Sequence, residues 1–526
     1  MSNEVGGNSL ADSAPEPKSY ARRFIKGSTI IFTAFIASEI IGVFLRMILA
    51  RSLTVEEYGL FYAIYAFISM FALFRDPGLG SALVKHIPEF TVKKRFAELK
   101  SSIFFSLIFQ AAFGLVVSAI LFIFSDHIAL AVFRTSTASL LLRILSAWFF
   151  VESFRSLLSS MSQGFQNMPI LALLSSLYIL LIFLLVICFV GILGLGLNGV
   201  ALSYLLATVL ISIFGMIFFI RRYSHVFREK ISITKPLVKK LFMFALPVFV
   251  AGFSDLILTY TDTLTITIFR TLPEVGYYQA AQPSARILWY VSSSLAAVLF
   301  PMISEFWARG QKKLLGQALY FVTKFSFILI IPAALIFITF PNIVITLLFS
   351  SRYLGGVTVL QIFGIAAFIY TIYNLLATAI LGMGRPGTIA KVVGIMAVLN
   401  LIGDLLLVPI YGIEGAATTT LAVFIIGLIL LMYYAKKFIR FTIPTNPLLK
   451  ASVGGALTLL FIFGLKSILA LSPWPEAIVT IVLAFAFYTT WILVTKVITR
   501  EDLKLIKEII PMPRWLVRVA EKIIRE

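Results

Sequence analysis

The segment EEYGLFYA at residues 56–63 returns as PEVGYYQA at residues 273–280, a shift of 217 residues. Four further matches follow in the same order at nearly the same shift: Ser38-Glu39 with Ser254-Asp255, IPEF at 87–90 with ISEF at 303–306, GLNGVA at 196–201 with GIEGAA at 412–417, and GFQNMP at 164–169 with the looser GMGRP at 382–386. Self-similarity at a fixed long period indicates an internal duplication. We therefore expect two halves of similar architecture.

The composition predicts what kind of unit is duplicated. Of the 526 residues, 60% are apolar and 13% are charged, and the mean hydropathy is +1.00. Soluble globular chains contain about 45–50% apolar and about 25% charged residues, so a soluble multidomain enzyme is excluded. Cys188 is the single cysteine, which excludes an internal disulfide and a cysteine-based metal site. The chain is predicted to be an all-α integral membrane protein.

The hydropathy pattern predicts fourteen transmembrane helices, because a membrane span needs about 20 apolar residues. Their ranges are 28–49, 59–84, 100–124, 138–162, 169–191, 196–220, 240–268, 276–304, 315–340, 355–381, 388–408, 412–435, 449–471 and 476–497. The period of the duplication covers six spans, an even number, so both copies enter the membrane from the same side. The expected architecture is two parallel six-helix repeats plus two C-terminal helices, and in transporters built this way the substrate site lies between the halves.

The basic residues predict the orientation. With a cytoplasmic N-terminus, 33 of the 44 Lys and Arg residues fall on the cytoplasmic side, including those at the cytoplasmic edges of the spans, and seven lie within spans. Only Arg51, Arg134, Arg270 and Arg352 fall outside. Cytoplasmic connections carry the excess of positive charge, so we expect a multi-pass protein of the cell membrane with both termini in the cytoplasm. Because the charges flank apolar segments, the net charge of +20 does not indicate a nucleic-acid partner.

The connections also divide the chain into parts. These are a disordered cytoplasmic tail at 1–20, an N-terminal six-helix lobe at 21–236, a C-terminal six-helix lobe at 237–440, helices 13 and 14 at 441–498, and an amphipathic cytoplasmic tail at 499–526. In the last part, apolar residues are interspersed with Lys, Arg and Glu. This pattern predicts a segment that lies on the cytoplasmic membrane interface, and a tail docked on the cytoplasmic loops is the alternative.

A family resemblance rests on three features. They are the arrangement of six, six and two helices, the E-x-G-x-Y/F-x-A type signature within 56–63 and 273–280, and FRDPGLGSALVK at 74–85. Together they resemble the polysaccharide-biosynthesis flippases of the multidrug/oligosaccharidyl-lipid/polysaccharide transporter superfamily. The resemblance implies a transporter, not an enzyme, that moves a lipid-linked oligosaccharide on an isoprenoid phosphate or pyrophosphate from the inner to the outer leaflet for cell-surface glycan assembly. A cation-coupled multidrug antiporter of the same superfamily is the alternative, and a membrane glycosyltransferase or polymerase is the rival from another class.

Ionisable side chains at membrane depth usually face a cavity or a partner, because they are costly in lipid. The candidates for a cationic, substrate-binding pocket are Arg46, Arg75 and Arg286, since arginine binds phosphate oxygens bidentately. The candidate cavity or ion-coupling acids are Glu39, Asp76, Asp255 and Asp262. Under the shift of 216, Glu39 and Arg46 map onto Asp255 and Asp262, so both halves place charges at the same two depths.

Several roles stay open for these residues. Arg75 and Asp76 could instead form a local pair that holds a kink at Pro77. Asp255 could be a counter-ion to a cavity arginine, a site for a coupling proton or Na⁺, or part of a polar network joining the halves. No nucleotide-binding P-loop occurs, so no cofactor is expected beyond possible Na⁺ or H⁺ coupling. The expected partners are a lipid-linked oligosaccharide and membrane lipid, and the expected state is a monomer.

Overall fold

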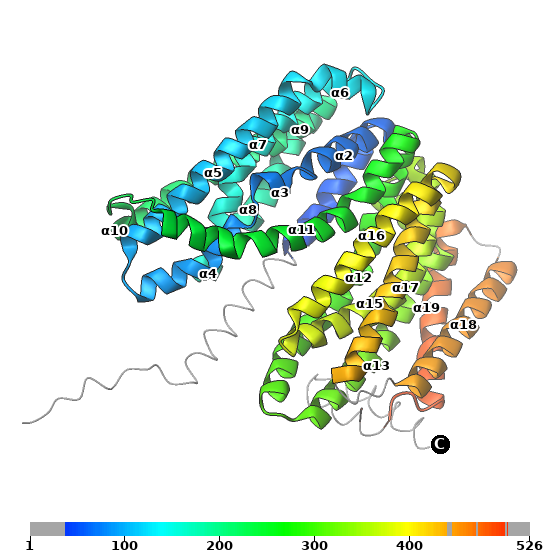
Figure 1. The fold of residues 1–526 in the computed structure, drawn as a ribbon. Helices are drawn as coiled ribbons and strands as arrows, with labels where there is room; N and C mark the ends of the chain where they lie inside the picture. Colours follow the sequence, from blue (N-terminus) through cyan, green and yellow to red (C-terminus); the bar gives the residue numbers. More distant parts are fainter. Residues whose placement is uncertain (1–36, 439–443, 470–471, 500–501, 503–526) are drawn as a thin grey trace, which may run out of the picture.

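The computed structural model describes residues 37–438, 444–469, 472–499 and 502. Within these ranges the protein is helical and contains no β-strand, which confirms the all-α prediction. Two bundles lie side by side (Figure 1). After a helix over 37–52, the first contains α2 (Val55–Ser69), α3 (Ala72–Arg75), α4 (Leu79–Val92), α5 (Phe96–Ile123), α6 (Ser125–Ala131), α7 (Ala138–Gly164), α8 (Met168–Val186), the π-helical η1 (Ile187–Ile192), α9 (Gly196–Arg222) and α10 (Ser224–Phe227).

The second bundle has α18 and α19 along its outer edge (Figure 1). It consists of α11 (Lys235–Phe269), α12 (Leu272–Ala308), α13 (Lys312–Thr339), α14 (Pro341–Leu348), the 3₁₀ turn η2 (Ser351–Gly356), α15 (Val357–Gly382), α16 (Pro386–Tyr411), α17 (Ile413–Phe438), α18 (Thr445–Ile468) and α19 (Pro473–Val494).

Among the described residues, twelve helices are long and apolar enough to cross a membrane. The predicted span at 138–162 corresponds to α7, which is 27 residues long but carries three charged side chains. The predicted span at 28–49 begins before the first described residue and is helical from residue 37. The count of fourteen therefore stays a prediction. The predicted tail at 1–20, and all of 499–526 except Thr499 and Asp502, lie outside the described residues.

The predicted span over 59–84, with its kink at Pro77, is divided further than expected, and its membrane-spanning part covers Val55–Arg75. Helix α2 ends at Ser69, α3 forms a single turn, and α4 begins only at Leu79. The break has a local cause, because Pro77 has no N–H to donate to a helix and Gly78 has a φ of +87°, which disfavours other residues. A Cβ at Gly78 would also lie 2.5 Å from the carbonyl oxygen of Ala245 in α11. The segment thus ends one helix and lets the next approach α11 closely.

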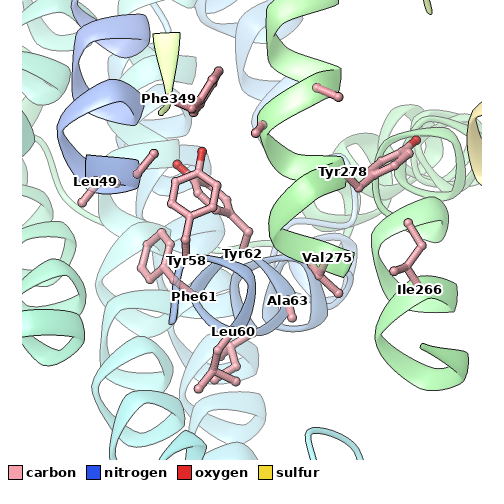
Figure 2. Packing of buried hydrophobic residues seen from close by; sticks show 14 of the residues in the cluster. Leu49, Tyr58, Leu60, Phe61, Tyr62, Ala63, Ile266, Val275, Tyr278 and Phe349 are labelled. Carbon is pink, nitrogen blue, oxygen red and sulfur yellow. The ribbon is translucent and has the colours of Figure 1, made fainter. Parts of the chain in front are cut away.

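Helices α2 and α12 carry the repeated signature and pack against each other by a mutual glycine contact. A Cβ at Gly59 of α2 would overlap the carbonyl oxygen of Leu272, and a Cβ at Gly276 of α12 would lie 2.5 Å from the carbonyl oxygen of Val55. Val55 and Leu272 are themselves related by the 217-residue shift, so each half makes the same contact to the other. Figure 2 shows the neighbouring helix faces in this region, where buried hydrophobic residues of both halves pack together.

Helix α11 joins the two bundles (Figure 1). Near its start, Leu241 and Ala245 are buried against α4 of the first bundle. Near its end, the hydroxyl-rich stretch from Thr261 to Thr267 is largely buried, and this helix packs extensively on α16 of the second bundle. Between these anchors lies a largely exposed stretch that contains Pro247. The helix therefore belongs to both halves.

Glu89 of α4 holds the start of α11. Its carboxylate accepts hydrogen bonds from Lys93 at 2.8 Å, from Lys240 of α11 at 2.9 Å, and lies 3.0 Å from Nδ1 of His86. These contacts, with Lys93 the largest, hold the pKa of the Glu89 carboxyl well below its usual range. Burial lowers the pKa of His86, which favours the neutral imidazole. The link between α4 and α11 is therefore an ion pair at physiological pH.

At the opposite end, arginines join the two bundles. Arg134 donates to the carbonyl oxygen of Ile268 at 3.0 Å, and Arg352 donates to the carbonyl oxygen of Arg51 at 2.9 Å. Arg51 in turn donates to the carbonyl oxygen of Leu347 at 2.7 Å. The carbonyls of Ile268 and Arg51 lie at the C-terminal ends of α11 and of the 37–52 helix, where cations are favourable. These bonds close the end of the molecule that the charge distribution predicts to face outside.

Candidate functional site between the two halves

The helix over 37–52 and α12 come from different halves and bring two charged layers together. In the first layer, the hydroxyl of Tyr290 donates to the Glu39 carboxylate across the two halves. Arg46 lies seven residues after Glu39 on its helix, and Arg286 lies four residues, about one turn, before Tyr290 on α12. The two guanidinium groups are close enough to influence each other electrostatically. The two helices run in opposite directions. The residue that follows Glu39 on one helix, Arg46, therefore lies at the level of the residue that precedes Tyr290 on the other, Arg286. The structure thus places Arg46 and Arg286 near each other, and the cationic pocket stays a prediction.

The surroundings of the two arginines are aromatic. The guanidinium of Arg46 lies 4.5 Å from the ring centroid of Tyr62, and Tyr58 and Tyr204 are also close. Its Nη1 is buried and has no hydrogen-bond partner among the described residues. Neither Arg46 nor Arg286 forms an ion pair with any described carboxylate. Arg46 also has a side-chain hydrogen bond with Tyr58. Donor capacity is nevertheless left over at Nη1 of Arg46, beside a second guanidinium group, and an anion could satisfy it.

Arg75 does not join this pair. It is buried inside the first bundle, where Nη1 donates to the carbonyl oxygen of Phe149 at 3.4 Å and the guanidinium lies 4.8 Å from the Phe149 ring. A Cβ at Gly114 of α5 would lie 3.6 Å from its Cγ. The structure therefore gives Arg75 contacts within one half.

Asp76 acts locally at the same break. Its Oδ1 accepts a hydrogen bond from the backbone N–H of Gly80 at 3.0 Å, in the first turn of α4. Such a bond satisfies one of the N–H groups that a helix start leaves without a partner. No ion pair joins Asp76 to Arg75 or to another described residue. This contact matches a role in holding the break at Pro77.

The two acids of α11 have different surroundings. Asp255 lies in the exposed middle stretch of the helix, and its carboxylate makes no hydrogen bond or ion pair with a described residue. Asp262, two turns later, is only 3% exposed. It accepts hydrogen bonds from Tyr278 Oη, from Asn400 Nδ2 at 3.1 Å and from Thr420 Oγ1 at 3.0 Å. Asp262 is therefore part of a polar cluster inside the second bundle.

This cluster contains a second carboxylate that the sequence reasoning did not select. Asp404 of α16 is fully buried beside Asp262 and Thr419. Neither of its oxygens has a donor in good hydrogen-bond geometry within the described chain. Asn400 Oδ1 and Thr419 Oγ1 are also buried without partners there. A signal existed, since Asn400 and Asp404 are four residues apart and share one helix face. Two carboxylates with amide and hydroxyl oxygens can hold a proton or a small hard cation between them.

Other metal chemistry finds no support in the described ranges, where no group of three or more His, Cys, Asp or Glu side chains converges. Several of the remaining membrane-depth charges are paired. Glu152 and Arg155 of α7 form a bidentate pair, as their spacing predicts. Lys324 of α13 is buried against Asp502. These residues thus contribute to packing and are not left to bind a substrate.

The model of the polysaccharide biosynthesis protein family matches residues 24–307, more than half of the chain. The chain belongs to this family. A relative from Methanocaldococcus jannaschii, named "Uncharacterized membrane protein MJ1068", is 31% identical over 434 residues, which are 80% of this chain and 86% of the relative. The "Probable low-salt glycan biosynthesis flippase Agl15" of Haloferax volcanii is 23% identical over 284 residues, or 53% of this chain and 60% of that relative.

Solved structures of the superfamily share the fold of this family member. The lipid II flippase MurJ in an inward closed conformation superimposes with a TM-score of 0.71 and 18% identity, covering 88% of this chain and 98% of that one. An inward-facing multidrug resistance transporter of the MATE family gives a TM-score of 0.62 and 16% identity over 77% and 94% of the two chains. The predicted family and the prediction of a membrane transporter rather than an enzyme are confirmed.

Proposed function

We propose that this polysaccharide biosynthesis family member flips a lipid-linked oligosaccharide from the inner to the outer leaflet, with Arg46 and Arg286 binding the phosphate or pyrophosphate of the isoprenoid carrier. The observation that carries the proposal is the pair of guanidinium groups between the halves, with the buried Nη1 of Arg46 left without a partner. Arginine forks match phosphate oxygens bidentately and keep their charge when desolvated. A head group placed between the two halves can be exposed to either leaflet by alternating access.

The edge of the second bundle offers room for the lipid chain. An apolar groove lies between α13 and the α18–α19 pair, where Leu329, Ile462 and Phe485 are among the lining residues. A second apolar groove lies between α13, α15 and α18 and includes Ile331 and Leu459. An isoprenoid chain needs apolar surface on a path beside the membrane, while its charged head group needs the arginines. This division of surfaces supports an amphipathic substrate over a soluble one.

Two further features support alternating access. The Asp262–Asp404 pair can take up H⁺ or Na⁺, and the occupancy of such a site can couple an ion gradient to a conformational change. The bonds from Arg134 and Arg352 to carbonyl oxygens across the halves close the predicted outer end. Outward opening has to break these bonds, so they stabilise the form that is closed on that side.

The test is transport of a fluorescent lipid-linked oligosaccharide in proteoliposomes. We expect Arg286→Ala to reduce transport at least tenfold without loss of protein, because a guanidinium in a pocket contributes little packing. Arg286→Lys should restore transport only in part, since it lacks the planar fork. Arg143→Ala is the matched control, because Arg143 is a membrane-depth arginine that bonds locally to Asp126 at 2.7 Å. Full transport by Arg286→Ala would remove Arg286 from the proposed site.

The cation-coupled multidrug antiporter is the second candidate, and the shared fold with MATE transporters favours it. An organic cation prefers an acidic or aromatic cavity and is repelled by two guanidinium groups. We therefore expect organic cations to be exported no faster by the wild type than by Arg286→Ala. Faster export of cations by the wild type, without flipping of the lipid-linked probe, would favour the antiporter instead.

A further inference from the structure

The first bundle contains a polar cavity at the predicted outer end. Its lining differs in chemistry from the arginine pair. The cavity has a volume of about 630 Å³, within the range of about 300–1,000 Å³ that is common for small-molecule sites. Three connections form it, namely those that precede α2, α7 and α9. Its lining residues are Thr54, Glu56, Glu57, Leu60, Thr135, Ser136, Thr137, Leu140, Gly194, Leu195, Gly196, Leu197 and Asn198.

The lining combines hydrogen-bond acceptors and donors. Glu57 is already used, because it forms a reciprocal capping box with Thr54 at the start of α2. By contrast, the carboxylate of Glu56 and the amide of Asn198 form no hydrogen bond with any described residue and are free to bind. Thr135 and Thr137 share a hydrogen bond of 2.8 Å at the rim. Hydroxyl, amide and carboxylate groups together match a ligand whose own groups both donate and accept.

The charge of the cavity excludes a phosphate. No Lys or Arg is among its described lining residues, and the neighbouring Arg134 directs its guanidinium to the carbonyl oxygen of Ile268 instead. Two glutamates repel an anionic head group, while several leucines give the wall an apolar component. A polyhydroxy ligand with apolar C–H faces satisfies both kinds of surface, because hydroxyl groups donate to carboxylates and accept from amide N–H groups. A carbohydrate has this chemistry.

The internal duplication supplies a comparison within the same molecule. Thr54, Glu57 and Gly196 correspond to Thr271, Glu274 and Gly412 in the second bundle. There Arg270 occupies the equivalent space, with Nε donating to the carbonyl oxygen of Val408 at 3.0 Å and lying 4.0 Å from Glu274. The residue of the first bundle that corresponds to Arg270 is Leu53, which is buried and leaves the hollow open. Only one of the two equivalent places is therefore available to a ligand in the described structure.

We propose that this cavity, centred on Glu56 and Asn198, binds the sugar portion of the substrate on the outer side of the membrane. The inference rests on the proposed flippase function and extends it, because the arginine pair would hold the phosphate while this separate site takes the glycan as it emerges. A subsite of this kind would favour net movement outward, since glycan binding stabilises the state in which the sugar has crossed.

The first experiment measures binding of soluble sugars to the full-length protein. We replace Cys188 by Ser, introduce Ser136→Cys at the exposed rim, and follow its reaction with a membrane-impermeant maleimide. N,N′-diacetylchitobiose and maltose are the probes, at millimolar concentrations because a single subsite binds weakly. We expect one of them to slow the labelling saturably. Glu56→Gln and Asn198→Ala should each raise the half-protecting concentration at least tenfold, whereas Glu414→Gln, at the position equivalent to Asn198, should leave it unchanged.

A second variant tests the same cavity while its melting temperature shows whether the protein is still folded. Ser136→Trp fills the hollow from its rim, and with a cysteine at Thr137 as the reporter it should abolish protection without a change in melting temperature. Absence of saturable protection by either sugar, or protection that Glu56→Gln and Ser136→Trp do not alter, would overturn the inference. Protection by calcium in the absence of sugar would overturn it as well, since it would assign the carboxylates to a cation.

The two proposals fail in different ways. If the wild type flips the lipid-linked probe but no sugar protects the rim cysteine, the sugar site is wrong and the flippase function stands. If sugars protect the cysteine but the probe is not flipped, and Arg286→Ala changes nothing, the flippase function is wrong. Under our proposal, Arg286→Ala reduces flipping at least tenfold and keeps sugar protection, while Glu56→Gln weakens protection and slows flipping.

Discussion

At the scale of single residues, the presence or absence of an ion-pair or hydrogen-bond partner helps to distinguish candidate binding side chains from structural ones. Glu152, Arg155 and Lys324 all have close ionic partners, so a buried charge alone does not indicate a site in this protein. Arg46 and Asp404 are different, because each has buried polar atoms without a partner in good geometry in the described chain and lies close to a second group of the same charge. Nε of Arg75 also lacks a partner, but Arg75 lies inside one half. An unpaired buried polar group is costly. Its presence therefore points to a ligand, an ion or a proton that completes the site.

Asp404 provides a prediction at this scale. Two adjacent buried carboxylates repel each other unless a proton or a cation lies between them, so we expect Asp404→Asn to fold and to lose the dependence of transport on H⁺ or Na⁺. Transport in proteoliposomes, measured across a series of pH values and Na⁺ concentrations, checks this. Asp255→Asn is the comparison variant, because it removes a carboxylate of α11 from an exposed position. Unchanged ion dependence in Asp404→Asn would exclude the pair as the coupling site.

At the scale of helices, close approach depends on glycine at the contacts between halves. The mutual contact of α2 and α12 brings each helix against a backbone carbonyl of the other. The break after α3 permits a similar approach of α4 to α11 at Gly78. In a membrane, where lipid tails are as apolar as leucine, small residues at helix interfaces allow the close packing that stabilises association. The repeated E-x-G-x-Y/F-x-A signature thus has a packing explanation.

Gly59→Ala and Gly276→Ala test this explanation. Each added methyl group meets a carbonyl oxygen of the facing helix, so the helices have to separate, and we expect a loss of about 1–3 kcal/mol of stability per substitution. The readout is the melting temperature of the purified protein in detergent. Gly42→Ala is the control, because a Cβ there meets nothing within 4 Å, and alanine is the better helix former. Equal melting temperatures for Gly59→Ala and Gly42→Ala would contradict the proposed contact.

At the scale of the whole molecule, the two ends differ in how the halves are joined. One end has the ion pair between Glu89 and Lys240, and the other has the bonds from Arg134 and Arg352 to carbonyl oxygens. The latter two bonds are related by the internal duplication, since Arg134 and Arg352 are 218 residues apart and their acceptors, Ile268 and Arg51, are 217 residues apart. The closed end is therefore held symmetrically. This symmetry supports the proposal of two parallel repeats.

Orientation is the prediction at this scale, because every assignment to the inner or outer leaflet depends on it. In the protein with Cys188→Ser, we expect Ser136→Cys to react with an impermeant maleimide from outside intact cells. Lys312→Cys, exposed at the start of α13, should react only after the membrane is opened. The physical reason is the excess of basic residues in the predicted cytoplasmic connections. The reverse labelling pattern would invert the model and place the polar cavity in the cytoplasm.

The sequence alone determined the properties that depend on composition and order along the chain. The helical membrane class follows from the apolar content, because lipid leaves backbone groups no partners except each other. The duplication at 216–217 residues placed Glu39 and Arg46 on a helix between the halves, and the family follows from the motifs. The pairing of Glu152 with Arg155 was also predictable, since both lie on one turn of one helix.

Only the tertiary structure decided which side chains of different helices meet. Each residue rotates the direction of a helical side chain by about 100°, so small differences in helix tilt and rotation decide whether Arg75 joins Arg46 or lies beside Phe149. The same reason explains why Asp404 was not linked with Asp262, and why Lys324 was not linked with Asp502, 178 residues away. The outer cavity depends on three connections distant in sequence. The pattern of residues along the chain does not show that these three connections lie together in space.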